Sequence, residues 1–371
     1  MQTIHRSAFR KRALLALLFV AVASLGAILY VNRSPHEAAQ PTNPPKPWFA
    51  PYVDVTNTPS YPFEQFGSTP HKDAILSFIT AATSDPCTPT WGGTYSLDNA
   101  DKELDLTSRI SHLRAQGGDV AISFGGAIGD ELASVCTDHH ELVSAYKSVV
   151  DHYRIAAIDL DLESTGLTDT STNTRRAKAI AELQTNIRRA SGNLAIWVTL
   201  PVAPSGLTSD GTNTITTLLN QHVNLAGINI MTMEYGDSRP DSQSMLDASK
   251  SALARTHDQI LTLYQNAGIP LSSQIAWSKL GVTPLIGRGT FPGEVFTLND
   301  AKDFSAYARS MGVWRTSMWS ANRDAPCANA SIENELAADS CSGIEQHKFD
   351  FAKTLSNGFT GTLRENAAPK R

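Results

Sequence analysis

Three acidic residues, Asp159, Asp161 and Glu163, stand at alternate positions in the run AAIDLDLE of residues 156–163. In a β-strand, alternate side chains point to the same face, so the three carboxyl groups would emerge together in a row. Neighbouring carboxylates raise one another's pKa, and at least one of them tends to stay protonated. A carboxylic acid that keeps its proton near neutral pH can protonate a leaving sugar oxygen, so the row indicates glycoside hydrolysis.

Two other interpretations of this row stay open on the sequence alone. An exposed edge strand also carries acidic residues at alternate positions without any catalytic role. A site for Mg²⁺ or Ca²⁺ would use carboxylate oxygens, but one straight strand presents its ligands in a line rather than around a centre. We therefore predict neither a metal nor a cofactor, and the position of the row in the fold has to decide between function and surface.

Composition excludes several classes of protein. The 371 residues are 41% hydrophobic and 18% charged, which is typical of a globular protein with a substantial core. The formal net charge of −5 and the lack of a basic stripe with interleaved aromatics argue against nucleic acid as a partner. No GxxxxGK[ST] or GxGxxG run is present, so the chain does not resemble a nucleotide enzyme.

The N-terminal residues have the pattern of a targeting segment. Basic residues between Arg6 and Arg12 precede an apolar run over residues 13–31, which is near the length that spans a bilayer. The pattern favours an uncleaved signal anchor, although Ala21-Val22-Ala23 also fits the cleavage site of a signal peptide. In either case, we expect the rest of the chain to be extracytoplasmic, anchored in the membrane or secreted.

The four cysteines, Cys87, Cys136, Cys327 and Cys341, fit an oxidising compartment. None forms a CxxC pair, so two disulfides are a simpler interpretation than a zinc site. Cys327 and Cys341 would close a short local loop, and Cys87 would then pair with Cys136 by elimination. Four cysteines allow three connectivities, so the pairing remains a prediction.

Four domains or segments follow from the remaining pattern: a signal segment (1–31), a proline-rich linker (32–46), a catalytic domain (47–360) and a short tail (361–371). Within the domain, eight short apolar runs predict strands at residues 48–55, 74–79, 119–124, 156–162, 195–200, 226–232, 281–284 and 313–319. Helical patterns separate them, for example the buried stripes within 142–150 and 180–187, and Asn299-Asp300 as a helix cap. Eight such units predict an α/β fold, a (β/α)8 TIM barrel.

Catalytic residues of such barrels lie where the strands end, and Glu163 ends the fourth predicted strand. Over Trp48 to about Phe359, the chain resembles the chitinases of glycoside hydrolase family 18. Residues 156–163 match the fourth-strand signature DGxDxDxE, and Ser123-Phe124-Gly125-Gly126 matches the third-strand SxGG motif. Met233-Glu234-Tyr235 resembles the sixth-strand Met-x-Tyr motif, and Trp319 corresponds to the tryptophan that closes the eighth strand.

The chain departs from the family pattern at two places. Ala156 and Ala157 replace the Asp-Gly pair with which the fourth-strand signature begins. Gly236 follows the sixth-strand tyrosine, where many members have an acidic residue; the nearby acids are Glu234, before this position, and Asp237, after it. Which of these two acids faces the substrate stays open.

The resemblance implies a substrate-assisted mechanism with retention, in which the substrate's 2-acetamido oxygen is the nucleophile. Glu163 would be the general acid and base, and Asp161 would orient the acetamido N–H. Asp159 would share a proton with Asp161, and Tyr235 would donate a hydrogen bond to the acetamido carbonyl. The residues expected to bind substrate are Trp319, Met231, Met233, Glu234, Ser123, Gly125, Gly126, Trp91 and Tyr52. Met231 and Met233 also fit a barrel core, and Trp91 and Tyr95 are either sugar platforms or packing residues.

The expected function is that of a chitinase, acting as a monomer on chitin or N-acetylglucosamine oligosaccharides. Two alternatives stay open: an endo-β-N-acetylglucosaminidase on other acetamido-glycans, and a non-catalytic chitin- or glycan-binding protein on the same fold. Endo or exo action, polymer or oligomer preference and the pH optimum are not determined by the sequence.

Overall fold

Parallel strands pair side by side in the structure, a computed structural model that describes residues 46–65, 71–328 and 338–367. In sheet order they are β3 (Asp73–Ala81), β6 (Asp119–Gly125), β7 (Ala157–Asp161), β8 (Ala195–Ala203), β10 (Leu225–Met231), β11 (Leu280–Thr283) and β14 (Arg315–Thr316). Each overlaps a strand predicted from the sequence. The predicted α/β class with a mostly parallel sheet is therefore confirmed.

The remaining predicted strand, at residues 48–55, is divided between two neighbours. Its first part, β1 (Trp48–Phe49), pairs in parallel with β14, and its second part, β2 (Tyr52–Asp54), pairs in parallel with β3. The segment thus joins the last strand of the sheet to the first, and the parallel strands form a closed ring. We call this arrangement the strand ring.

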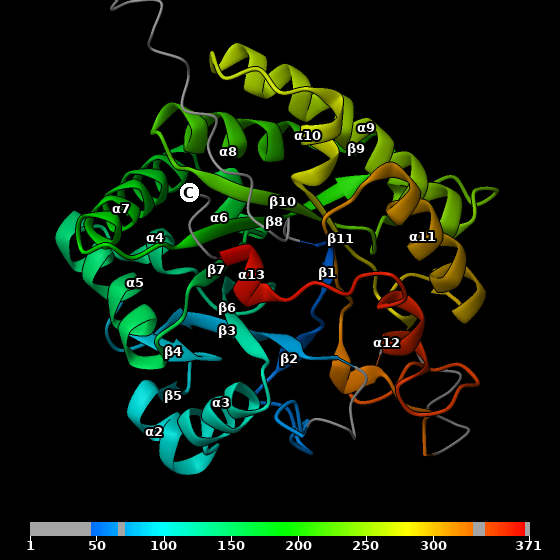
Figure 1. Cartoon of the computed structure of the whole chain (residues 1–371), viewed down its shortest axis with the longest axis horizontal. Helices are drawn as coiled ribbons and strands as arrows, with labels where there is room; N and C mark the ends of the chain where they lie inside the picture. Colours follow the sequence, from blue (N-terminus) through cyan, green and yellow to red (C-terminus); the bar gives the residue numbers. More distant parts are fainter. Residues whose placement is uncertain (1–45, 66–70, 329–337, 368–371) are drawn as a thin grey trace, which may run out of the picture. The chain divides into compact units, whose positions relative to one another are not determined.

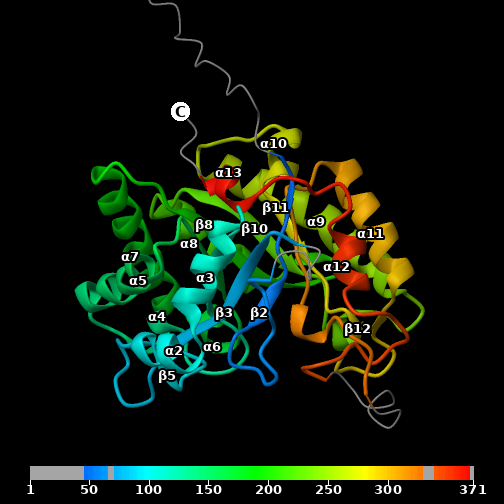
Figure 2. The same ribbon diagram turned by 60° about the horizontal axis from the view of Figure 1, so that its bottom comes forward.

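Helices follow the strands of the ring and, apart from α13 at one end, cover its outside (Figure 1 and Figure 2). They are α2 (Leu97–Glu103), α3 (Leu106–Ala115), α4 (Leu132–Val135), α5 (His139–Tyr153), α6 (Ser164–Thr168), α7 (Thr170–Arg189), α8 (Ser209–Asn220), α9 (Met245–Asn266), α10 (Ser273–Ser278), α11 (Leu298–Met311), α12 (Asp350–Leu355) and α13 (Leu363–Ala367). Short antiparallel strands extend the ring at β4 (Pro89–Trp91), β5 (Tyr95–Ser96) and β9 (Gly206–Leu207), and β12 (Gly287–Arg288) pairs with β13 (Val295–Phe296). The 3-10 turns are η1 (Gly236–Ser238) and η2 (Ala321–Arg323).

The helix patterns in the sequence correspond to real packing surfaces. In α5 the predicted stripe is buried, with Tyr146 and Val149 wholly inaccessible to solvent. The cap predicted at Asn299-Asp300 is corrected by the structure. The N-cap of α11 is Thr297, whose hydroxyl accepts from the Asp300 N–H while the Asp300 carboxylate accepts from the Thr297 N–H. Asp300 therefore belongs to the first turn, as the partner in a capping box.

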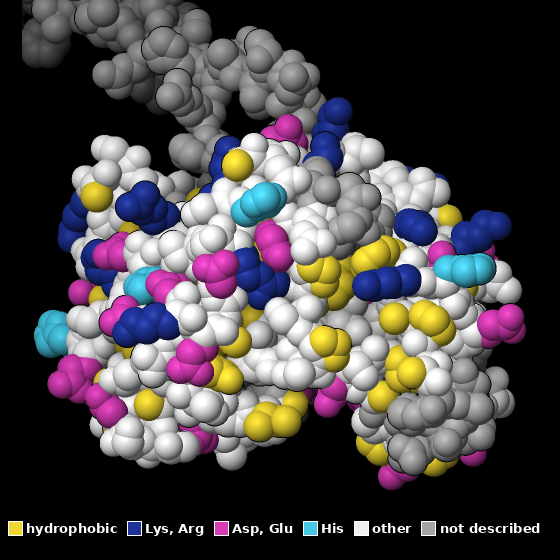
Figure 3. Space-filling view, turned by 90° about the horizontal axis from the view of Figure 1, so that it is seen from below, with side chains coloured by type: hydrophobic (Ala, Val, Ile, Leu, Met, Phe, Trp, Pro, Cys, Tyr) yellow, Lys and Arg dark blue, Asp and Glu magenta, His cyan; other side chains and the backbone are white. Residues whose placement is uncertain are grey.

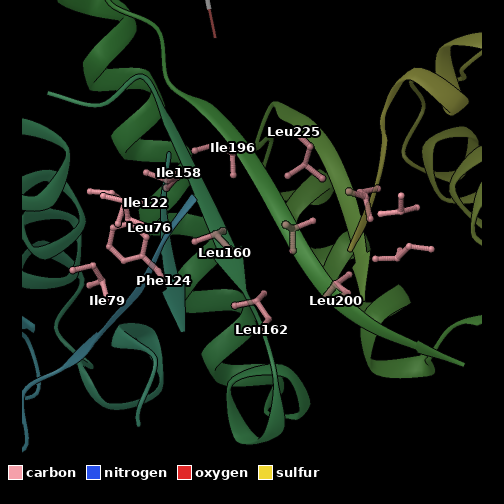
Figure 4. Close-up of a cluster of buried hydrophobic side chains, with 14 of the residues drawn as sticks. Leu76, Ile79, Ile122, Phe124, Ile158, Leu160, Leu162, Ile196, Leu200 and Leu225 are labelled. Carbon is pink, nitrogen blue, oxygen red and sulfur yellow. The ribbon is translucent and has the colours of Figure 1, made fainter. Parts of the chain in front are cut away.

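The main apolar core lies between the ring and the helices. Figure 4 shows Ile158, Leu160 and Leu162 of the β7 segment beside Ile122 and Phe124 of β6, and all five are fully buried. Because side chains alternate along a strand, this placement directs the acidic residues between them to the inside of the ring. The interior and the exterior of the ring are thus chemically different, apolar outside and partly charged inside.

Helix α13 covers the end of the ring at which the strands begin. Leu363 is buried there among Trp48, Ala121 and Trp197, and its backbone N–H donates to Asp73 Oδ2 at 2.8 Å. The candidate site lies at the opposite end of the ring, where the strands finish.

On the face drawn in Figure 3, acidic and basic side chains are interspersed, and neither sign dominates.

Both predicted disulfides are present. Cys87 is bonded to Cys136, which ties the segment before β4 to the end of α4 across 49 residues of chain. Cys327 is bonded to Cys341 across 14 residues. No free cysteine remains among the four.

These two loop lengths lead to a stability prediction. Replacing Cys87 and Cys136 with serine should lower the free energy of unfolding by about 4 kcal/mol, against about 3 kcal/mol for the Cys327–Cys341 pair, because the entropy of the cross-linked unfolded chain falls with loop length. Urea unfolding of the two double variants under identical conditions measures the difference. A larger loss for the shorter loop would contradict the loop-entropy argument.

Several predictions concern residues outside the described ranges. The apolar run at residues 13–31 and nearly all of the linker at 32–46 lie there. Within the described residues, no helix has both the length and the apolar character needed to cross a bilayer. The anchor, its cleavage and the domain boundaries therefore stay predictions.

Candidate active site

The row of three acidic residues runs outward along the inside of the ring. Asp159 and Asp161 belong to β7 and are buried, with 0% and 4% of their surfaces exposed. Glu163 follows in extended conformation as the N-cap residue of α6, is half-buried, and makes no capping hydrogen bond with its side chain. Its carboxyl group is consequently not used to stabilise the short helix that follows.

Asp159 accepts hydrogen bonds on both of its oxygens. The hydroxyls of Tyr52 and Ser123 donate to Oδ2 at 2.8 Å each, and the Thr199 hydroxyl and the Arg315 guanidinium donate to Oδ1 at 2.8 and 2.9 Å. Four donors, one of them the Arg315 cation, therefore fix the orientation of this carboxyl group. Asp159 thus forms an ion pair with Arg315, and the proton predicted to be shared with Asp161 stays a prediction.

Asp161 is in the opposite situation. Its Oδ1 is buried and has no hydrogen-bond partner among the described residues. Burial raises the pKa of Asp161 well above its usual range, and the negative charges of Glu163 and Asp159 add to the shift. Burial also raises the pKa of Glu163. Two adjacent carboxyl groups with raised pKa values can hold and exchange a proton near neutral pH.

A cavity of about 420 Å³ opens beside these two acids. The wall of this cavity includes Tyr52, Thr199 and Thr283 in addition to the two acids. The wall also contains Phe78, Ala127, Ile128, Met231, Met233, Glu234, Leu285, Thr290, Trp319, Arg323 and Asp339. The lining is largely apolar, with a few convergent polar groups, as is typical of a site for a small or extended organic ligand.

Aromatic rings form one part of this wall. Trp319 and Phe78 stack with their centroids 5.3 Å apart and their planes 23° from parallel, and Tyr52 lies 6.1 Å from Trp319. Trp319 is only partly buried. An indole face that is supported from behind and open to a cavity can pack against the C–H face of a pyranose ring.

The choice between Glu234 and Asp237 is resolved by their positions. Glu234 lines the cavity, whereas Asp237 is exposed and outside the lining. The backbone N–H of Thr290 donates to Glu234 Oε1 at 2.9 Å, and the Thr290 hydroxyl donates to Oε2. Burial raises the pKa of Glu234, while the Thr290 N–H and the charge of Arg323 lower it. Glu234 is thus fixed by the turn between β12 and β13.

Tyr235 does not lie where the motif comparison predicted. It is 5% exposed, packs in the core outside the ring, and its hydroxyl donates to Ser249 Oγ of α9 at 3.5 Å. The chain leaves β10 at Met231, and Glu234 has a positive φ of 50°, so the alternation of the strand no longer holds at Tyr235. Met231, Met233 and Glu234 reach the cavity instead.

Four other residues that were predicted to bind substrate lie outside the cavity lining. Trp91 is fully buried, and its indole N–H donates to the Tyr153 hydroxyl at 2.9 Å, so it is a packing residue rather than a sugar platform. Ser123 contacts Asp159 and does not line the cavity. Gly125 and Gly126 also lie outside the lining.

Gly125 is required by the close approach of two strands. It has φ 104°, and a Cβ at this position would lie 2.0 Å from the Asp161 carbonyl oxygen. The glycine therefore allows β6 to pack beside the acid row, which is a different role from the predicted contact with substrate.

Sequence reasoning missed Arg315, Thr199 and Asn229 inside the ring, and Phe78, Ile128, Thr290, Arg323 and Asp339 in the cavity wall. For Arg315 a signal existed: a lone cation within the apolar run 313–319 is rarely buried unless it is paired. Ile128 is 88% exposed in the loop after β6. This exposure indicates a binding residue only when the position of the cavity is already known.

Among the described residues, one group of three has the spacing of metal ligands: Cys87, Cys136 and Glu141. Its two sulfurs are joined in a disulfide, so they cannot act as thiolate ligands. The group is exposed at Glu141 and is separate from the acid row.

No family model matches the chain. It is 32% identical over 289 residues to the "Probable bifunctional chitinase/lysozyme" of Escherichia coli (strain K12), covering 76% of this chain and 31% of that protein. It is also 32% identical over 300 residues to "Endochitinase 11" of Metarhizium anisopliae, covering 79% of this chain and 55% of that protein. The chain thus spans about a third and about half of these two relatives.

Solved structures share the fold. The catalytic domain of a hyperthermophilic chitinase from Pyrococcus furiosus superposes with a TM-score of 0.70 at 24% identity, over 90% of this chain and 99% of that one. A GH18 chitinase from Pseudoalteromonas aurantia gives a TM-score of 0.50 at 14% identity, over 74% of this chain and 94% of that one. The similarity to named chitinases, together with the strand-end motifs, shows that the chain belongs to glycoside hydrolase family 18.

Proposed function

We propose that this protein is a chitinase that hydrolyses β-1,4-linked N-acetylglucosamine polymers or oligomers with retention of configuration. The observation that carries the proposal is the position of Asp161 and Glu163, both with raised pKa values, in the wall of the cavity that Trp319 also lines. The names of the relatives at 32% identity support the same substrate class.

In the proposed reaction Glu163 donates its proton to the glycosidic oxygen as the bond to the anomeric carbon breaks. The carbonyl oxygen of the substrate's 2-acetamido group forms the new bond to that carbon, giving an oxazolinium ion. Glu163, now a carboxylate, then removes a proton from water, which attacks the same carbon and releases the acetamido oxygen. Two displacements restore the original configuration.

Asp161 would accept the acetamido N–H and oppose the positive charge of the oxazolinium ion. Its unpartnered Oδ1 leaves an acceptor available for this contact. Glu234 is less suited to that role, since Thr290 already occupies both of its oxygens. Trp319, supported by Phe78, would pack under the sugar at the cleavage point.

The proposal includes the setting in which the enzyme works. The strand ring and its surrounding helices support a (β/α)8 TIM barrel as the catalytic fold. Two disulfides support an oxidising compartment outside the cytoplasm. We further propose that residues 13–31 anchor or export the chain and that it acts as a monomer; fractionation of cells that express it and size determination in solution test these two points.

The proposed activity is tested by incubating the full chain with N-acetylglucosamine oligomers and recording product anomers by proton NMR before mutarotation. Newly formed β-anomer supports the retaining, substrate-assisted reaction. Initial α-anomer would overturn the mechanism. Binding without cleavage would identify a glycan-binding protein instead.

A second candidate is hydrolysis of peptidoglycan, because the Escherichia coli relative is named both chitinase and lysozyme. Both sugars of peptidoglycan carry the 2-acetamido group that the proposed mechanism requires. Release of soluble fragments from purified peptidoglycan, measured beside chitin oligomers at equal enzyme concentration, distinguishes the two. Faster turnover of peptidoglycan would make it the preferred substrate.

The corrected position of Tyr235 makes a further prediction. Tyr235→Phe should lower the free energy of unfolding by less than about 1 kcal/mol, since the contact to Ser249 is long at 3.5 Å, and leave kcat/KM nearly unchanged, because the hydroxyl faces Ser249 and not the cavity. Glu234→Gln, at a cavity position, is the matched comparison and should lower kcat/KM. A loss of several orders of magnitude for Tyr235→Phe would return this tyrosine to the active site.

A further inference from the structure

Arg315 is a buried cation in the middle of the strand ring. It lies on β14, is 1% exposed, and donates from Nη1 to Asp159 Oδ1 and from Nη2 to the Tyr52 hydroxyl, both at 2.9 Å. The two donors bridge β14 to β7 and β2 across the interior. Neither the cavity lining nor the strand-end motifs include this residue.

Three aromatic rings hold the guanidinium group in place. Its central carbon lies 5.5 Å from the ring of Trp48, 5.5 Å from that of Tyr52 and 5.1 Å from that of Trp197. Such contacts stabilise a desolvated cation and restrict it to one orientation. The charge is therefore fixed relative to the acid row, unlike that of a flexible surface arginine.

The surroundings of Asp159 contain few other charges. The side chains that face it are Tyr52 (β2), Ser123 (β6), Thr199 (β8) and Arg315 (β14), with Asp161 next along its own strand. Asn229 of β10 donates in turn to Thr199 and, at 3.4 Å, to Tyr52. Arg315 is the one cation among these groups, so it alone balances the charge of Asp159.

We infer that Arg315 is a positioning residue of the active site: by pairing with Asp159 across the ring, it balances the charge of the deeper acid and leaves Asp161 unpaired, so that Asp161 can face the substrate as an anion. The inference rests on the proposed function, in which Asp161 must be ionised while Glu163 is protonated. Without Arg315, the charge of Asp159 would be left uncompensated, which would disfavour the anionic form of Asp161.

Substitutions of Arg315 and of Asp159 should shift the pKa of Asp161 in opposite directions. Arg315→Met removes a cation near Asp161, which raises the pKa of that carboxyl group, since the cation lowers it in the native protein. Asp159→Asn removes an anion and leaves the cation, which lowers the pKa of Asp161. Removing both charges in the double variant restores the balance. Each single shift should be on the order of one pH unit.

The test is the pH dependence of kcat/KM for the full chain on a p-nitrophenyl glycoside of the N-acetylglucosamine dimer. The acid limb, which reports ionisation of Asp161, should move to higher pH in Arg315→Met, to lower pH in Asp159→Asn, and return close to its native position in the double variant. Arg315→Lys keeps the charge and should rescue most of the shift. The alkaline limb, set by Glu163, should move less.

A role limited to packing would lower kcat without moving the acid limb in opposite directions, and that result would overturn the inference. So would shifts of both single variants in the same direction. Circular dichroism and thermal unfolding identify variants that do not fold. If Arg315→Met fails to fold, Asp159→Asn and the double variant still decide, because their acid limbs must differ in the stated direction.

A readout independent of activity separates this inference from the proposed function. In a Glu163→Gln background, infrared titration of the protonated carboxyl band is recorded with and without Arg315→Met, and subtraction of the same titrations in variants that also carry Asp161→Asn isolates the Asp161 contribution. A shift of the band's midpoint to higher pH supports the inference even if no glycan is cleaved. An unmoved midpoint in a folded variant refutes it even if the wild-type chain is an active chitinase.

Discussion

Glu163→Gln is expected to lower kcat for N-acetylglucosamine oligomers by roughly 10²–10⁴-fold, the usual contribution of a general acid and base. Glutamine keeps the shape of the side chain but has no proton that it can transfer to the glycosidic oxygen. The substitution should leave the fold intact, because the Glu163 side chain makes no capping hydrogen bond to α6 and is half-buried in the cavity wall.

The measurement is steady-state kinetics on oligomers, with binding of the same oligomers followed by calorimetry. Affinity should be largely retained, which separates lost chemistry from lost binding. Asp237→Asn is the matched control, since Asp237 is an exposed acid outside the cavity lining. Activity of Glu163→Gln near that of the control would remove Glu163 from the mechanism.

The leaving group provides a sharper version of this test. A substrate whose leaving group is already a weak base, such as a dinitrophenolate, needs little protonation in the first step. Glu163→Gln should therefore lose much less activity for bond cleavage in that substrate than in a sugar oligomer. Equal losses for both substrates would indicate that Glu163 acts through binding or structure and not by proton transfer.

Local patterns in the sequence were sufficient for much of the fold. The eight strands each carry an apolar run that is readable within a few residues, and the acid row follows from the alternation of one strand. The disulfides were also predictable, since four cysteines allow few pairings and one pair is close in the chain. These features depend on neighbours in the sequence.

The errors arose where distant segments or a local turn decide the outcome. Arg315 and Asp159 are 156 positions apart, so although the apolar run around Arg315 indicates that this cation needs a partner, nothing local identifies Asp159 as that partner. Trp91 is buried because β4 pairs with β3 and brings it against Tyr153. For Tyr235, the positive φ at Glu234 ends the strand alternation on which its prediction depended.

Asp161→Asn is the second substitution with a large expected effect. Asparagine is nearly isosteric, but it is neutral and cannot oppose the positive charge of the oxazolinium ion. Because that charge exists only after the leaving group departs, the loss should fall on kcat rather than on KM, by roughly 10²–10³-fold, as for other preorganised electrostatic contacts. Removal of the neighbouring carboxylate should also lower the pKa of Glu163 and move the alkaline limb of kcat/KM to lower pH.

A mimic of the intermediate tests this role without turnover. A thiazoline derivative of the N-acetylglucosamine dimer has the fused ring of the oxazolinium ion and becomes protonated when bound beside a carboxylate. Its affinity should fall in Asp161→Asn by about as much as kcat falls, while the affinity for intact oligomers changes little. If thiazoline binding is retained and oligomer binding is lost, Asp161 serves ground-state binding, and the charge-stabilising role assigned to it in the cavity is wrong.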